Sequence, residues 1–129
     1  MNAAARLICS ARKYDHVTPL LRELHWLRVP ERITFRLAVY AYRCQHGLAP
    51  SYLADDIRRV ADVESRRRLR SASTAQLLVP LTERSTIGDR AFPVAAWNSL
   101  SPHVTSSPSL PVFRSRLKTE LFARSFGIV

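Results

Sequence analysis

The sequence has little glycine, little cysteine, few acidic residues and no long apolar run. Three Gly among 129 residues are too few for a Gly-rich phosphate-binding loop. Two cysteines, Cys9 and Cys44, lie far apart and do not form the pattern of a disulfide framework. No apolar run is long enough to cross a bilayer, and the N-terminus lacks the features of a signal peptide. These absences predict a soluble, intracellular protein without a membrane partner, and they leave nucleus and cytoplasm open.

Positive charge, in contrast, is in surplus. The chain carries 20 Lys and Arg against 10 Asp and Glu, a net charge of +10, and its isoelectric point is near 11.0. All but two of the basic residues are Arg, whose guanidinium group forms paired hydrogen bonds to phosphate and stacks on bases. This composition favours RNA or DNA as the partner. GC-rich coding DNA is an alternative explanation, because it also produces an Arg-rich chain.

Apolar residues recur mostly at helical spacing, so the expected fold class is mainly α, a small helical domain with one short β-hairpin (α+β at the margin). The expected helices cover residues 1–11, 18–28, 31–46, 50–60, 93–100 and 109–125. The expected strands cover residues 76–79 and 86–92, and residues 101–111 are expected to form a proline-rich loop.

The segment 31–46 is the clearest of these helices. Pro30 suits its first turn, and Gly47 is expected to end it in the left-handed conformation. Two apolar sides are expected to be buried, one with Ile33, Leu37, Tyr40 and Cys44 and the other with Phe35, Ala38 and Tyr42. The remaining side holds three basic residues at nearly the same angle around the helix, here called the arginine edge: Arg32, Arg36 and Arg43.

A second basic cluster lies in an Arg- and Ser-rich stretch, residues 61–75, which is expected to be a linker. Four of five consecutive residues are arginines: Arg66, Arg67, Arg68 and Arg70. Such a run can lie along a phosphate backbone. A solvated charged loop and a nuclear-localisation signal are the alternatives for the same residues.

No arrangement typical of a catalytic or cofactor site is found. A G-x-S-x-G nucleophile motif is absent. Cys44 and His46 have no second pair at ligand spacing, so no metal or other cofactor is expected; Cys44 is expected in the core and His46 at a helix end. Asp55 and Asp56 follow an aromatic residue, as metal-binding carboxylates do in polymerase palms, but they fall in a predicted first helical turn, where acids favour the helix dipole. The chain is therefore expected not to be an enzyme and to take no small-molecule substrate.

Several short segments, spread along nearly the whole chain, carry a resemblance to a known family. They are residues 25–27, 31–33, 42–50 with 52 and 53, 69–71, 79–80, 88–92, 97–100 and a final group between 113 and 122. This order resembles the region that follows the palm in reverse transcriptases of non-LTR (LINE-type) retrotransposons. The chain departs from the pattern at Arg28 and Val29, which precede Pro30, at Leu81 after Pro80, and at Ser101. The stretch between Phe92 and Trp97 is also short.

The resemblance implies an organisation for the chain. Residues 1–60 would be a helical segment like the end of a thumb, residues 61–75 the linker, and residues 76–129 the hairpin with the C-terminal helices. In the family, the catalytic palm and the endonuclease precede this region, so no catalytic residue is carried over. The region is thought to help hold template RNA and target DNA.

We therefore expect a non-catalytic fragment of a LINE-type RNA-directed DNA polymerase that contributes nucleic-acid binding through its Arg clusters. The expected contacts are Arg32, Arg36, Arg43, Arg66, Arg67, Arg68 and Arg70, which would touch phosphates without reading bases. The alternative is a translated retrotransposon remnant with no retained molecular function, which the departures from the family pattern favour. RNA or DNA preference and the oligomeric state stay open.

Overall fold

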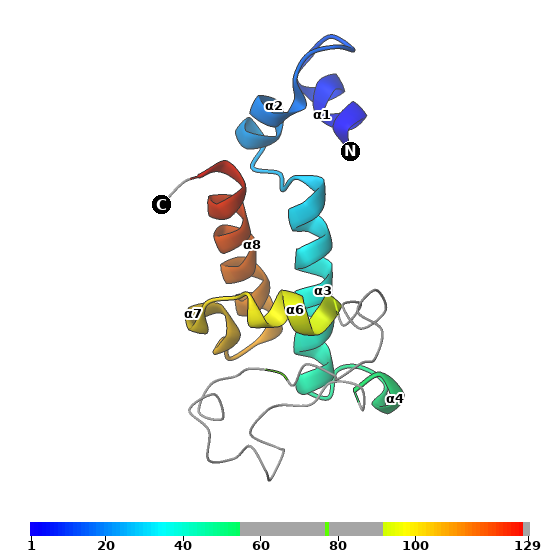
Figure 1. Ribbon diagram of the computed structural model, residues 1–129. Helices are drawn as coiled ribbons and strands as arrows, with labels where there is room; N and C mark the ends of the chain where they lie inside the picture. Colours follow the sequence, from blue (N-terminus) through cyan, green and yellow to red (C-terminus); the bar gives the residue numbers. More distant parts are fainter. Residues whose placement is uncertain (55–76, 78–91, 128–129) are drawn as a thin grey trace, which may run out of the picture.

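A computed structural model describes residues 1–54, Leu77 and residues 92–127, and within them the chain is mainly helical (Figure 1). The helices are α1 (Asn2–Ile8), α2 (Val17–Glu23), α3 (Val29–Gln45), α4 (Ser51–Ala54), α6 (Phe92–Asn98), α7 (Pro102–Thr105) and α8 (Leu110–Phe126). The predicted mainly α class is confirmed. None of the helices in these ranges is long and apolar enough to span a membrane.

The two long helices, α3 and α8, form the centre of the molecule. They lie side by side, α6 packs across α3, and α7 packs on α8 (Figure 1). Three buried aromatic rings join these elements: Tyr42 lies 4.5 Å from Phe113, and Phe113 lies 5.6 Å from Trp97, measured between ring centroids. The buried Tyr42 hydroxyl donates a hydrogen bond to the carbonyl of Ser107, at 3.2 Å. Helices distant in sequence are thus held by one aromatic core.

The ends of α3 agree closely with the prediction. Arg28, directly before the first residue of α3, has an extended backbone. Pro30 lies in the first turn of the helix, where the missing proline N–H removes no helical hydrogen bond. At the other end Gly47 has φ of +67°, and the Leu48 N–H reaches back to the Arg43 carbonyl at 2.8 Å. The predicted left-handed glycine is confirmed.

The buried face of α3 differs in part from the prediction. The side with Phe35, Ala38 and Tyr42 does pack into the core, but Ile33 on the other predicted side is 55% exposed. The small side chains of Ala38 and Ala41 let α6 and α8 approach α3 closely. Cys44, on the same predicted side as Ile33, is buried, so the prediction fails at Ile33 and not along the whole side.

Helix α2 begins and ends earlier than predicted. It starts after His16, not Thr18, and its last residue is Glu23, not Arg28. His25 has φ of +53°; its N–H reaches the Arg22 carbonyl at 3.2 Å, and the Trp26 N–H reaches the Leu21 carbonyl at 2.8 Å. This pair of bonds is a Schellman motif, which normally has glycine at the left-handed position. The prediction failed because no glycine marks the stop.

The whole of the predicted linker lies outside the described residues, as do most of the predicted hairpin and most of the helix predicted over residues 50–60. Helix α4 starts where that last helix was expected. Phe92, predicted to end the second strand, is the first residue of α6, so the strand prediction is wrong there. Leu77 is buried, and the Asn98 side-chain amide accepts from its N–H at 2.9 Å and donates to its carbonyl at 3.0 Å.

The predicted loop 101–111 contains α7, so the prediction is wrong for that turn. The Glu120 carboxylate accepts hydrogen bonds from the Ser101 hydroxyl at 2.5 Å and the Ser101 N–H at 3.3 Å, and it also pairs with Arg124. Pro102 occupies the first turn of α7. Helix α8 itself lies within one residue of its predicted bounds at each end, and it places three side chains in the core: Phe113, Leu117 and Leu121.

Candidate nucleic-acid interface

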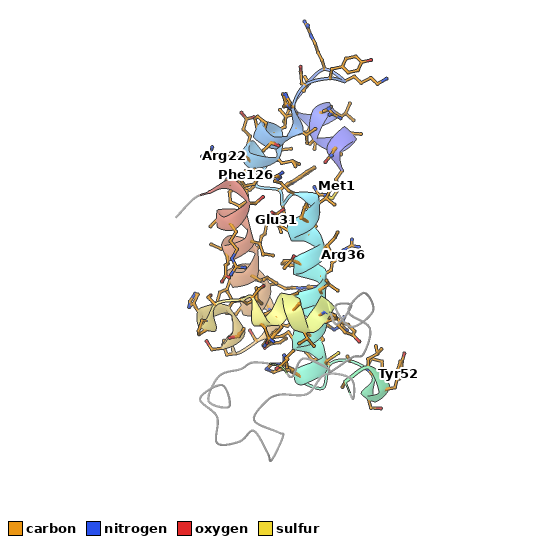
Figure 2. The ribbon with its side chains drawn as sticks, in the orientation of Figure 1. Met1, Arg22, Glu31, Arg36, Tyr52 and Phe126 are labelled. Atoms are coloured by element: carbon orange, nitrogen blue, oxygen red, sulfur yellow. The ribbon has the colours of Figure 1, made fainter. Side chains whose placement is uncertain are left out.

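The three residues of the arginine edge differ in exposure: one is half-buried and two are exposed. Arg36 is exposed on the side of α3 (Figure 2), and Arg43 is exposed near its end. Arg32 is half-buried instead, and its Nε donates to the Leu27 carbonyl at 2.7 Å. Arg32 therefore fastens the loop before α3, and Arg36 and Arg43 are the members available to a phosphate.

Arg43 is only loosely held by its own chain. Its terminal nitrogen lies 3.4 Å from the Leu48 carbonyl, at the long end of hydrogen-bond geometry. The second predicted cluster, Arg66, Arg67, Arg68 and Arg70, lies outside the described residues, as do Asp55 and Asp56. The candidate interface can therefore be described only for α3 and for the helices near the start of α3.

Charge on the described residues is poorly neutralised within the chain. Between those residues there is one salt bridge, from Arg124 to Glu120. Arg22, Arg28, Arg36 and Lys118 are all exposed. An exposed guanidinium or ammonium without a carboxylate partner retains its attraction for phosphate, and ions in solution screen that attraction.

A cleft that the sequence did not predict opens between α2 and the C-terminal end of α8, here called the α2–α8 cleft. It has a volume of about 750 Å³ and is lined by Thr18, Pro19, Arg22, Glu23, His25, Phe122, Ser125 and Phe126. Figure 2 shows Arg22 and Phe126 at this same end of the molecule, close to the start of α3. Two smaller cavities, of about 210 and 360 Å³, adjoin it through His25 and are both bordered by Lys118.

Three rings form a row in the α2–α8 cleft. The His25 ring lies 5.3 Å from Phe122, and Phe122 lies 4.7 Å from Phe126. His25 is exposed, whereas the two Phe side chains are half-buried. The Schellman motif fixes the His25 backbone, and so it sets where the ring projects. An accessible aromatic surface bordered by Arg22 and Lys118 results.

Polar groups in and near the cleft are incompletely paired. Ser125 Oγ and the Glu31 Oε2 atom are buried and have no hydrogen-bond partner in the part of the chain that the structure describes. Ser125 lines the cleft, and Glu31 lies close by at the start of α3 (Figure 2). Buried oxygen atoms usually accept or donate a hydrogen bond, so these two atoms near the cleft are exceptions among the described residues.

Cys44 and His46 have structural roles. Cys44 is buried. The His46 ring stacks on Tyr42 with centroids 3.9 Å apart, and its Nδ1 donates to the Tyr42 carbonyl at 2.9 Å. Both predicted placements, core and helix end, are confirmed. Over residues 1–54, 77 and 92–127, no group of three or more His, Cys, Asp or Glu side chains is arranged to hold a metal ion.

The sequence does not predict the α2–α8 cleft, because the residues that line it come from opposite ends of the chain. The helix stop at His25 gave no sequence signal either, because it lacks the usual glycine. Comparisons with protein-family models, curated proteins and solved structures found no match to this chain. The functional argument therefore depends on the geometry and charge of its own residues.

Proposed function

We propose that this protein binds RNA or DNA by contacting the phosphate backbone of the nucleic acid, and that it has no catalytic role. The observation that carries the proposal is unneutralised positive charge at exposed sites. Arg36 and Arg43 lie on one edge of α3, and neither forms a salt bridge with another described residue. A net charge of +10 adds long-range attraction for a polyanion.

The resemblance to the post-palm region of LINE-type reverse transcriptases supports the same proposal. Under it, the chain is a fragment of an RNA-directed DNA polymerase that helps to hold template RNA or target DNA. Arg66, Arg67, Arg68 and Arg70 would extend the phosphate contacts beyond α3. Arg32 contributes by fixing the start of α3, because its guanidinium already bonds the Leu27 carbonyl.

The test is a salt series on the binding of short RNA and DNA oligonucleotides, measured by fluorescence anisotropy. The Arg36→Gln/Arg43→Gln double variant should bind more weakly, and its slope of log binding constant against log salt should be smaller by about 0.7–0.9 for each phosphate contact removed. The control is Arg12→Gln/Lys13→Gln, which removes two exposed charges from the loop between α1 and α2. Its slope should stay closer to that of the wild type.

Two results would reject the proposal. The first is a wild-type binding constant that hardly changes between low and high salt, because phosphate contacts release counterions. The second is an equal loss of slope in both double variants, which would show a diffuse charge effect and no interface on α3.

A further inference from the structure

The α2–α8 cleft has the dimensions of a ligand site. Its volume of about 750 Å³ lies within the range of about 300–1,000 Å³ that is usual for small-molecule pockets. One nucleotide is smaller than this, so a base and its flanking phosphates fit together. The cleft lies near the start of α3 (Figure 2).

The accessible ring of the cleft is His25, and the rings do not share a plane: His25 is tilted by 37° to Phe122, and Phe122 by 49° to Phe126. Phe122 lies between His25 and Phe126, at 5.3 and 4.7 Å, and His25 leaves much of its ring open to solvent. Every base has a flat π-face, and proteins that bind single strands place aromatic rings against such faces. Paired bases inside a duplex are covered by their neighbours and do not offer that face.

His25 has an unfavourable backbone conformation at the end of α2. A left-handed φ of +53° is unfavourable for a residue with a Cβ atom, and glycine suits the end of α2 better. His is among the non-glycine residues that tolerate this conformation best. The left-handed turn thus carries an imidazole ring, which contacts Phe122.

Charges around the rings suit an anionic ligand. Arg22 lines the cleft, and Lys118 borders the two adjoining cavities through which His25 is also exposed. One carboxylate, Glu23, also lines the cleft and opposes a phosphate. Arg22 and Glu23 cancel within the cleft, and Glu31 lies close by. The positive charge available to a phosphate therefore comes from the adjoining cavities, which Lys118 and Arg32 border. An acidic peptide would use the cations but not the aromatic row, so the rings favour a nucleic acid.

We propose that the α2–α8 cleft holds an unpaired base of a single-stranded nucleic acid, stacked on His25 and packed against Phe122 and Phe126, with its phosphates on Arg22 and Lys118. This inference rests on the proposed function, since it presupposes that the protein binds nucleic acid. It adds a preference for single strands over duplexes and a location for the base. RNA and DNA share the chemistry, so both are tested.

The experiment compares a short single strand, as RNA and as DNA, with the duplex of the same sequence, and each strand carries one fluorescent adenine analogue. Stacking on a ring should change the fluorescence of the analogue when the wild-type protein binds the single strand. His25→Gly and Phe126→Ala should each weaken single-strand binding by about 5- to 100-fold, the range of one lost base–ring contact. Duplex affinity and the salt slope should change little.

The variants separate a binding role from a structural one. Gly suits the left-handed position, so His25→Gly should fold at least as well as the wild type in a thermal melt. Glu23→Gln removes the opposing carboxylate and should tighten single-strand binding. Arg36→Gln/Arg43→Gln is the matched control: it should weaken single strands and duplexes alike without abolishing the fluorescence change at saturation.

The outcomes distinguish the two proposals. If the protein binds no nucleic acid, both fail. If salt-dependent binding persists but the analogue does not respond and the ring variants bind normally, the cleft inference fails and the proposed function stands. If the ring variants instead alter self-association in sedimentation, the cleft is an interface between copies of this chain, and the inference is wrong.

Discussion

Two residues in the left-handed conformation determine how the N-terminal helices end. Ser10 has φ of +52° after α1, as His25 does after α2. Each is followed by a backbone bond that reaches back over the helix end, from the Ala11 N–H to Arg6 and from the Trp26 N–H to Leu21. Such positions usually hold glycine, so both carry backbone strain that a sequence pattern does not reveal.

Replacing Ser10 with glycine should relieve this strain. Ser10→Gly is expected to stabilise the end of α1 by about 1 kcal/mol, since an L-residue in this conformation costs about 1–2 kcal/mol. Amide hydrogen exchange at Ala11 should slow by about fivefold or more. Ser10→Ala is the control, because alanine keeps the Cβ atom; equal slowing in both variants would contradict the explanation.

A single amide side chain satisfies the backbone of buried Leu77. Asn98→Asp should keep the bond from the Leu77 N–H but place a carboxylate oxygen against the Leu77 carbonyl, in place of the donor that now lies 3.0 Å away. The loss of a buried donor should lower the free energy of unfolding by about 1–3 kcal/mol, measured by urea denaturation. Asn2→Asp, exposed at the start of α1, should change it by less than about 0.5 kcal/mol.

At the scale of elements, a side chain from the long helix α8 stabilises the start of the short helix α7. Helix α7 has only four residues, too few to be stable alone. Its start is fixed by Glu120 of α8, which accepts two hydrogen bonds from Ser101. Arg124 holds that carboxylate and also donates to the Ser99 carbonyl at 2.7 Å, so one group on α8 joins the ends of α6 and α7.

Removing the charge of Glu120 should therefore loosen α7. Glu120→Gln should lower the free energy of unfolding by about 1–2 kcal/mol, because hydrogen bonds to a charged acceptor contribute more than neutral ones. Chemical denaturation measures the change. Glu23→Gln, at an exposed carboxylate, is the control; a similar loss there would show that overall charge, and not the contact with Ser101, is responsible.

Helices α3 and α8 could be predicted from the sequence, and the α2–α8 cleft could not. Leu117 and Leu121 follow the period of a helix, and this local signal is enough to place α8. The row of His25, Phe122 and Phe126 requires residues from distant parts of the sequence to meet. No spacing in the chain encodes such a meeting.

At the scale of the whole molecule, the aromatic core bears on whether the protein is a folded domain or a remnant. Tyr42, Phe113 and Trp97 are almost fully buried and come from three different helices. Contacts of this kind form together, which makes unfolding cooperative.

A thermal melt should therefore show one sigmoidal transition, at the same midpoint in far-ultraviolet circular dichroism and in tryptophan fluorescence. Phe113→Ala should lower the stability by about 3–5 kcal/mol and shift both probes together. A featureless melt of the wild type would favour the remnant. A cooperative melt combined with salt-dependent binding would favour a retained binding domain.

The sequence by itself determined the helical class, the long helices, the left-handed Gly47 and the positive charge, because propensity, periodicity and charge are local properties of the chain. Tertiary structure decided that Ile33 is exposed while Ala38, Ala41 and Cys44 are buried, since burial depends on which helices pack against each position of α3. It also turned Arg32 inward while leaving Arg36 exposed. Finally, it brought His25 to Phe122, because the distance between two residues in space is set by packing and not by their separation along the chain.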